Sequence, residues 1–299
     1  MPRKSRPPID HDGLHKQLFS QFFQQFLEGF FPEVAAELDF SDFGPDSILT
    51  QELFPELPSK RHHVDLVAKV RPKAGGKDAF LIVFIEAQTK RRPEFLARVF
   101  RYFALLHIKF GTVVVPIVLY GDNSRKPLED RWTRYSVDFA GHRFLDFRFL
   151  AVHPTSLPVR EYLHSHNPVQ LALAARMDLG EGDLVRIKLD LLRQMAKLPM
   201  SESQLEQAVR YLEAYLEEED SEAFQRELAL LAQQEHQEAG MGTFIDYFTK
   251  IGMEKGKAKG LEEGLRQNAI ENARKMLERG CDWEFVTDVT GIRQEDLAS

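Results

Sequence analysis

Apolar residues recur at helical spacing over residues 13–38, the first patterned stretch of the chain. They fall about every fourth position, at Leu14, Leu18, Phe22, Phe26 and Phe30. This period predicts an amphipathic helix whose aromatic stripe faces the core. Pro32 is expected to interrupt or restart the helix, because proline lacks a backbone N–H.

Two apolar runs of strand length follow, at residues 64–70 and 79–88, and a Pro/Gly-rich turn separates them. This pattern predicts a β-hairpin. Asp65 lies near the start of the first strand and Glu86 near the end of the second. Antiparallel pairing brings those two ends together, so we expect the two carboxylates to be neighbours. Gln88 shares a strand face with Glu86, since side chains alternate along a strand.

The next segments predict an α/β fold with a helix between strands. The expected elements are a short strand at 47–53, a helix from about 89 to 109, a buried strand at 112–120 and a last strand at 145–152. Pro116 within the buried strand indicates a bulge or an unpaired side. After residues 154–158 the pattern becomes helical throughout, with helices expected at 159–166, 168–178, 182–197, 201–219 and 221–237.

Composition changes this picture little. The 299 residues are 43% hydrophobic and 28% charged, with one cysteine and no apolar run long enough to span a bilayer. The basic N-terminus is not followed by the apolar segment of a secretory signal. We therefore expect a cytoplasmic protein that does not enter membranes.

Charge is distributed unevenly along the chain. Residues 59–110 hold 12 Lys and Arg against 4 Asp and Glu, whereas residues 201–239 hold 2 against 11. Such segregation favours a basic functional face and a separate acidic segment. Two solvated surfaces that differ by chance are the alternative.

The C-terminal tail has glycines every fourth residue, at Gly252, Gly256, Gly260 and Gly264. Glycine costs a helix about 1 kcal/mol relative to alanine, so this spacing indicates either close packing against a partner helix or a linker. A helix at 269–279, a cap at Gly280 and a short helix at 283–289 predict a helix–turn–helix arrangement. We favour packing or self-association for it over DNA contact.

A family resemblance appears in the hairpin. Asp65 followed by Glu86-Ala87-Gln88 resembles the PD-(D/E)XK nuclease signature, with Gln in place of Lys. Four stretches resemble the Rpn family of recombination-promoting nucleases, also called YhgA-like transposases: H-D-G-L-H-K-Q-L-F from His11, F-F-P-E from Phe30, I-E-A-Q-T from Ile85 and R-V-F-R-Y from Arg98.

The resemblance covers roughly residues 10–155 and implies a restriction-endonuclease-like core, a mixed sheet flanked by helices. An all-α C-terminal region follows. The expected domains are a nuclease core at 1–155, a helical extension at 156–239 and a Gly-spaced tail at 240–299.

The same resemblance implies the site residues. Asp65, Glu86 and the backbone carbonyl of Ala87 would ligate Mg²⁺ or Mn²⁺, with Glu33 as a further ligand chosen over the other candidates Glu28 and Glu37. Gln88 would orient the attacking water, and Lys90, or an arginine of the next helix, would supply the positive charge that glutamine lacks. The expected phosphate contacts are Arg61, Arg91, Arg92, Arg98 and Tyr102; a surface ion pair is the alternative role for Arg98.

These observations favour a metal-dependent DNA endonuclease connected with recombination. The alternative is a catalytically weak DNA- or protein-binding module that keeps the nuclease fold and forms a homo-oligomer through its C-terminal helices. A purely structural oligomer is a third possibility. No G-x-x-x-x-G-K-[ST] or G-x-S-x-G motif is present, so neither a nucleotide cofactor nor a serine hydrolase is expected.

Overall fold

The computed structural model describes residues 11–49, 66–75, 79–86, 93–216, 224, 226, 260–261 and 264–297. The chain forms two compact units, residues 1–241 and 242–299. No helix in the described part of the chain is both long and apolar enough to cross a membrane.

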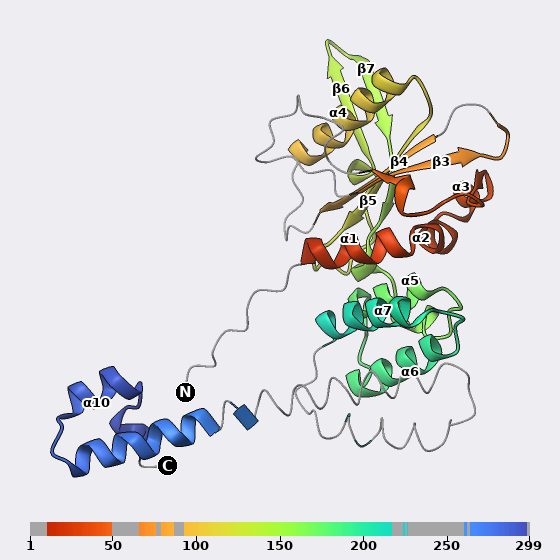
Figure 1. Ribbon diagram of the computed structural model, residues 1–299. Helices are drawn as coiled ribbons and strands as arrows, with labels where there is room; N and C mark the ends of the chain where they lie inside the picture. Colours follow the sequence, from red (N-terminus) through yellow and green to blue (C-terminus); the bar gives the residue numbers. More distant parts are fainter. Residues whose placement is uncertain are drawn as a thin grey trace. The chain divides into compact units, whose positions relative to one another are not determined.

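A six-stranded mixed sheet organises the first unit (Figure 1). Its strand order is β1–β3–β4–β5–β8, and β2 also pairs with β3. The strands are β1 (Leu38–Asp39), β2 (Ile48–Leu49), β3 (Leu66–Pro72), β4 (Ala79–Glu86), β5 (Val114–Tyr120) and β8 (Leu150–Val152). β3 and β4 are antiparallel, which confirms the predicted hairpin, whereas β4, β5 and β8 run parallel to one another.

Helix α4 (Pro93–Phe110) connects β4 to the parallel strand β5. It begins at Pro93. Proline is favoured at the first helical position, because the backbone N–H that it lacks would make no intrahelical hydrogen bond there. Its apolar residues, among them Val99 and Leu106, pack with Val118 of β5 in one core cluster. Tyr135 and Phe147 of a separate two-stranded sheet, β6 (Arg134–Phe139) and β7 (His142–Arg148), join this cluster.

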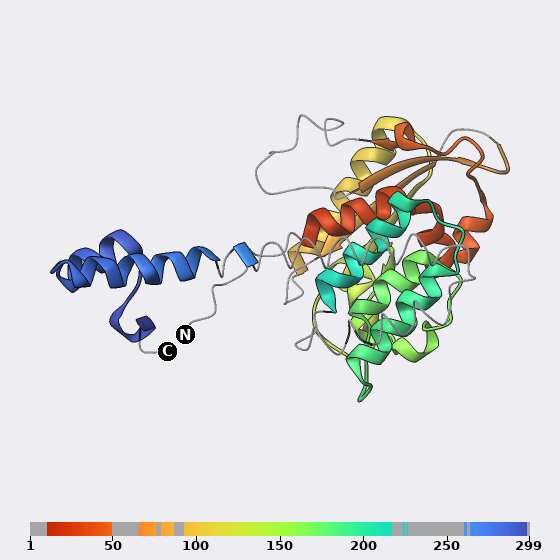
Figure 2. The ribbon, with the colours of Figure 1, turned by 60° about the horizontal axis from the view of Figure 1, so that its bottom comes forward.

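The N-terminal segment is helical, as predicted, and breaks at residues 22 and 31. The helices are α1 (His11–Gln21), α2 (Phe23–Phe30) and α3 (Pro32–Ala36), and Pro32 occupies the first turn of α3. The aromatic stripe is buried: Phe19, Phe22 and Phe26 have no exposed surface. Both ribbon views show α1 beside α7 (Glu202–Tyr215) (Figures 1 and 2).

Capping residues delimit the later helices of this unit. Asn167 and Asp183 accept hydrogen bonds from N–H groups in the first turns of α5 (Pro168–Leu173) and α6 (Leu184–Ala196). Ser201 and Gln204 form a capping box at the start of α7. The helix expected at 159–166 is only a 3₁₀ turn, Val159–Glu161.

One predicted strand needs correction, whereas one of the two alternatives expected at Pro116, the unpaired side, is present. The single strand expected at 145–152 is divided, because β7 pairs with β6 whereas β8 pairs with β5. Pro116 lies opposite Ile82 without a bulge, and β8 pairs only with Ile117–Leu119 of β5. The proline therefore has an unpaired side, where its missing N–H costs no ladder hydrogen bond.

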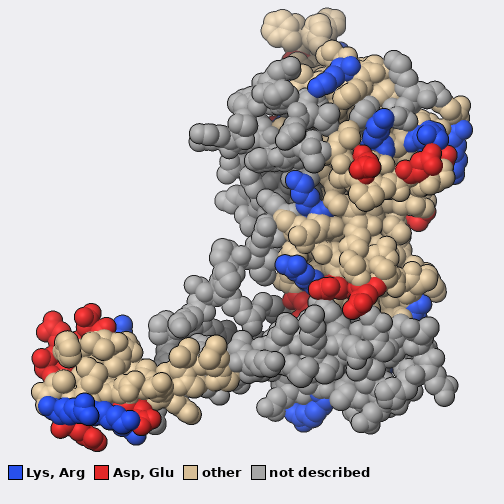
Figure 3. Space-filling view, in the orientation of Figure 1, with Lys and Arg blue, Asp and Glu red and all other residues tan. Residues whose placement is uncertain are grey.

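The second unit contains a helical run over residues 264–278 and helix α10 (Trp283–Thr290). Gly280 and Gly291 end the two helices with φ of 86° and 70°, a backbone conformation that favours glycine. Ala273, Val286 and Ile292 form a small core between them. In this unit Lys and Arg side chains gather in a row along one side, with Asp and Glu on neighbouring surfaces (Figure 3).

Candidate active site at the carboxyl edge of the sheet

The parallel strands β4, β5 and β8 finish at the same edge of the sheet. Glu86, the last residue of β4, pairs in register with Tyr120, the last residue of β5. Leu119 pairs with Val152, the last residue of β8. β3 begins at this end as well, since Leu66 pairs with Val83. Ligands of α/β proteins commonly bind at the carboxyl ends of parallel strands, so this edge is the candidate site.

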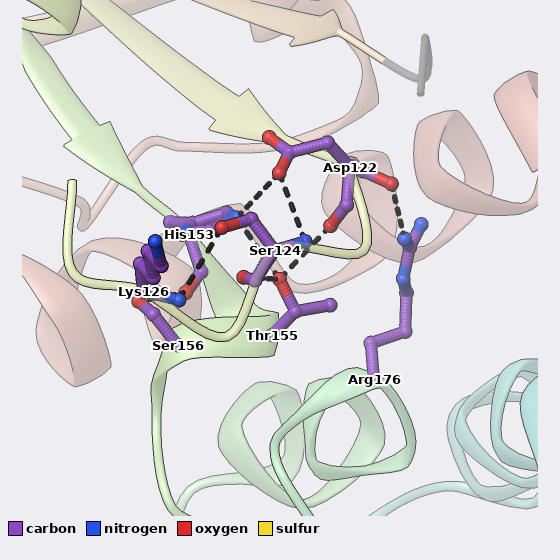
Figure 4. A network of polar contacts seen from close by, with 8 residues as sticks. Asp122, Ser124, Lys126, His153, Thr155, Ser156 and Arg176 are labelled. Atoms are coloured by element: carbon purple, nitrogen blue, oxygen red, sulfur yellow. Dashed lines mark hydrogen bonds and ion pairs between the residues drawn. The ribbon is translucent and has the colours of Figure 1, made fainter. Parts of the chain in front are cut away.

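Two buried polar side chains follow the strand ends. Asp122 lies two residues beyond β5 and His153 directly after β8, and they are 5% and 4% exposed. Asp122 Oδ1 is 3.3 Å from His153 Nε2 and also accepts the Ser124 N–H at 3.0 Å (Figure 4). Buried carboxylate and imidazole groups are costly without such partners, so the pair ties the two strand ends together.

Thr155 determines which nitrogen of His153 carries a proton. Its Oγ1 lies 2.9 Å from the Asp122 carbonyl oxygen, 2.8 Å from the Ser124 carbonyl oxygen and 2.9 Å from His153 Nε2. A threonine hydroxyl has one proton, and carbonyl oxygens only accept. The hydroxyl therefore donates to the carbonyls and accepts from His153, whose Nε2 is the protonated nitrogen.

The helical region holds the same loop from another side. Arg176 Nη2 donates to the Gly121 carbonyl oxygen at 2.6 Å (Figure 4). Its guanidinium also lies over the Tyr215 ring of α7, 4.9 Å from the centroid, a cation–π geometry. The residues after β5 are thus supported by β8 and by the helices that follow it.

Most of the predicted site residues lie outside the part of the chain that the structure describes. They are Arg61, Asp65, Ala87, Gln88, Lys90, Arg91 and Arg92. Glu86 is at the carboxyl edge as the final residue of β4. Half of the 12 basic residues of the 59–110 segment also fall outside the described part.

Glu33 lies away from this edge. It is exposed in the first turn of α3, and the Lys73 N–H donates to the carbonyl oxygen of Glu37 just after that helix, at 2.8 Å. β1 then pairs with Arg71 and Pro72, the end of β3 farthest from Leu66. This position counts against Glu33 as a ligand beside Glu86.

The two predicted phosphate contacts on α4 differ in exposure. Tyr102 is 2% exposed and belongs to the core cluster, a position that counts against the expected contact with a DNA phosphate. Arg98 is half-buried, and its guanidinium carbon lies 4.9 Å from the Phe95 ring centroid. Arg98 stays a predicted phosphate contact.

Sequence reasoning missed Asp122 and His153. Residues 121–123 have the composition of a turn, because glycine, aspartate and asparagine are typical turn residues. The available signal was position: His153 comes directly after a strand that the sequence predicts, and Asp122 lies two residues beyond another. Among the described residues, no group of three or more His, Cys, Asp or Glu is arranged to hold a metal ion.

A cavity of about 140 Å³ lies elsewhere, beside β1 and β3. It is lined by opposite charges, including Asp42 and Arg71, which form an ion pair at 3.0 Å. The Ser41 N–H donates to Asp39 and holds the pKa of that carboxyl below its ordinary value. The cavity lies at the end of β3 opposite Leu66, away from the carboxyl edge, so it is not the candidate site.

The fold and the edge define an α/β protein with its candidate site at the carboxyl ends of parallel strands. A family model described as "Putative transposase, YhgA-like" matches residues 9–206 of the 299-residue chain. The chain therefore belongs to the family of YhgA-like transposases. No solved structure matches it.

Proposed function

We propose that the protein is a metal-dependent DNA endonuclease with a restriction-endonuclease-like core, acting in recombination. The observation that supports it most is the position of Glu86, at the carboxyl edge where β3 begins and β4 and β5 end. Asp65 precedes Leu66 by one residue. The proposal requires Asp65 to reach this edge beside Glu86. Membership of the YhgA-like family is consistent with DNA as the substrate.

The proposed donor set suits a hard divalent cation. Asp65, Glu86 and the Ala87 carbonyl offer only oxygen atoms, and Mg²⁺ binds a few protein oxygens while it keeps several waters. Mn²⁺ accepts the same ligands. When bound, such an ion lowers the pKa of a coordinated water and offsets charge on a phosphate. The carboxylates hold the ion, and both must be ionised to do so.

Other residues would orient the reactants. The Gln88 amide hydrogen-bonds a water but carries no charge, so Lys90 supplies a cation in its place. Arg98 on α4, with Arg61, Arg91 and Arg92, binds backbone phosphates; a guanidinium can contact two phosphate oxygens at once. These roles position DNA across the edge and need no nucleotide cofactor.

Nicking of supercoiled plasmid tests the proposal. We expect cleavage with Mg²⁺ or Mn²⁺ that EDTA abolishes and that Asp65→Ala and Glu86→Gln lose without unfolding. Glu33→Gln is the matched control, since it removes a carboxylate from α3 at the other end of β3. Unchanged cleavage by both site variants would refute the assignment of the site.

The presence of Gln88 in place of lysine favours a second candidate function. The protein would then be a catalytically weak DNA- or protein-binding module that assembles through its C-terminal helices. Calorimetric titration with Mn²⁺ separates the two functions: the endonuclease binds the ion and Glu86→Gln does not, whereas the module shows no such binding. Light scattering of chains ending at residue 241 tests the assembly.

A further inference from the structure

The loop that follows β5, residues 121–126, has a fixed backbone and outward-facing polar side chains. Thr155 Oγ1 donates to the carbonyls of Asp122 and Ser124, and Arg176 donates to that of Gly121. The Lys126 N–H donates to Ser124 Oγ at 3.3 Å. The loop is therefore anchored by hydrogen bonds from two other segments and by its own.

The exposed side chains of this loop are polar or cationic. Asn123, Arg125 and Lys126 are exposed, while Gly121 and Asp122 beneath them are buried. Arg125 Nη1 is 3.3 Å from Asp178 Oδ1, and its side chain remains 69% exposed. Within the described part of the chain, Lys126 has no acidic side chain at ion-pair distance. The loop offers no apolar surface, so a polyanion suits it better than a protein partner.

The position of the loop connects it with the candidate active site. It starts one residue after Tyr120, which pairs with Glu86, and neighbouring strands are about 4.8 Å apart. A phosphodiester chain that lies across the carboxyl edge of β4 therefore passes the loop. Because the loop backbone is already held by hydrogen bonds, little backbone conformational entropy is lost when DNA binds, and the remaining cost is the ordering of the side chains.

We propose that residues 121–126 form a DNA-backbone contact arm, in which Lys126 and Arg125 bind phosphates and the Asp122–His153–Thr155 network positions them. The proposal rests on the proposed endonuclease function and deepens it. Lys126 acts as a point charge toward a phosphate, while Arg125 has further N–H donors besides the one that faces Asp178. Thr155 is a positioning residue, because it acts through the loop backbone.

The test is binding of a fluorescent DNA duplex to the full chain, with Ca²⁺ replacing Mg²⁺ to hold back cleavage. Lys126→Ala is expected to weaken binding about three- to tenfold and to reduce the salt slope by about one. Lys73→Ala is the matched control, since it removes the same charge from an exposed site at the opposite end of β3. If Lys126→Ala and Lys73→Ala bind DNA with equal affinity while the wild type binds and cleaves it, the contact arm is refuted and the proposed endonuclease function is not.

A double-mutant cycle tests the positioning role. Thr155→Val removes the hydroxyl with little change in shape, and it is expected to weaken DNA binding in wild type but not in the Arg125→Ala/Lys126→Ala double variant. Additive losses would show that Thr155 does not act through these two side chains and would overturn its role. If the wild-type chain neither binds nor cleaves DNA, both the arm and the proposed endonuclease fail.

Discussion

Asn167 joins two parts of the first unit that lie far apart in sequence. Its Oδ1 accepts the N–H groups of Val169 and Gln170 at 3.0 and 3.2 Å, which caps α5. Its Nδ2 donates to the carbonyl oxygen of Gln25 in α2 at 2.7 Å. Asn167→Ala therefore removes a cap and a bridge together.

The expected loss is the sum of these two effects. Loss of an N-cap costs about 1 kcal/mol, and loss of a part-buried neutral hydrogen bond costs about 1 kcal/mol more. Asp183→Ala is the matched control, because Asp183 caps α6 from an exposed position through Val185 and Arg186 and makes no hydrogen bond to the described residues of α2. Asn167→Ser keeps a capping hydroxyl and loses only the bridge. We expect about 2, 1 and 1 kcal/mol for the three variants.

Urea unfolding followed by fluorescence measures these differences. The chain has two tryptophans, and Trp132 lies in the first unit while Trp283 lies in the second. A Trp283→Phe background makes the signal report on the first unit alone. If Asn167→Ala costs no more than Asp183→Ala, the bridge to α2 contributes nothing and the reasoning is wrong.

Four further predictions concern the two units. Gly29→Ala should destabilise α2, because the new Cβ would lie 3.0 Å from Asn167 Nδ2. Gly264→Ala should increase the helix content, because the added Cβ would meet nothing within 4 Å. Circular dichroism measures this gain in helix, and urea titration measures the loss of stability in Gly29→Ala. Burial raises the pKa of Tyr211 well above its ordinary value. The neutral hydroxyl therefore stabilises the folded chain below about pH 10, and this stabilisation declines as the pH rises further. Tyr211→Phe should therefore cost about 1 kcal/mol near neutral pH, from the bond to His15, and the cost should shrink in alkali; a constant cost would contradict this. A chain ending at residue 155 should aggregate while one ending at 241 unfolds cooperatively, and a soluble, cooperative shorter chain would show that the helices are dispensable.

Local patterns predicted the main elements of the sheet. The hairpin of β3 and β4, helix α4 and strand β5 follow from short-range periodicity and turn residues, and all are present. Their order also implied that Glu86 ends a strand. The residues expected around it, Asp65 and Gln88, lie outside the described part, so the metal site stays a prediction.

Long-range packing explains what sequence reasoning missed. Tyr102 has the spacing of a surface partner for Arg98, yet α4 is covered by the β6–β7 sheet and its ring is buried. The β6–β7 sheet was not predicted, because the single strand expected at 145–152 covers the end of β7 and all of β8. β7 and β8 are distinct strands because they pair with different partners, β6 and β5. The pattern along a single segment does not show which strands will pair.

The boundary expected at residue 155 does not coincide with a boundary between compact units. The helical pattern does change there, but the helices beyond it complete the core rather than extend it. Tyr211 of α7 reaches the fully buried His15 of α1, and Arg176 reaches the Gly121 carbonyl at the carboxyl edge. Because Gly121 adjoins the strand that pairs with Glu86, the helical region is part of the scaffold of the candidate site. If the proposed function holds, Tyr215→Ala in α7 is expected to weaken DNA binding at the edge through Arg176, although Tyr215 itself contacts no ligand.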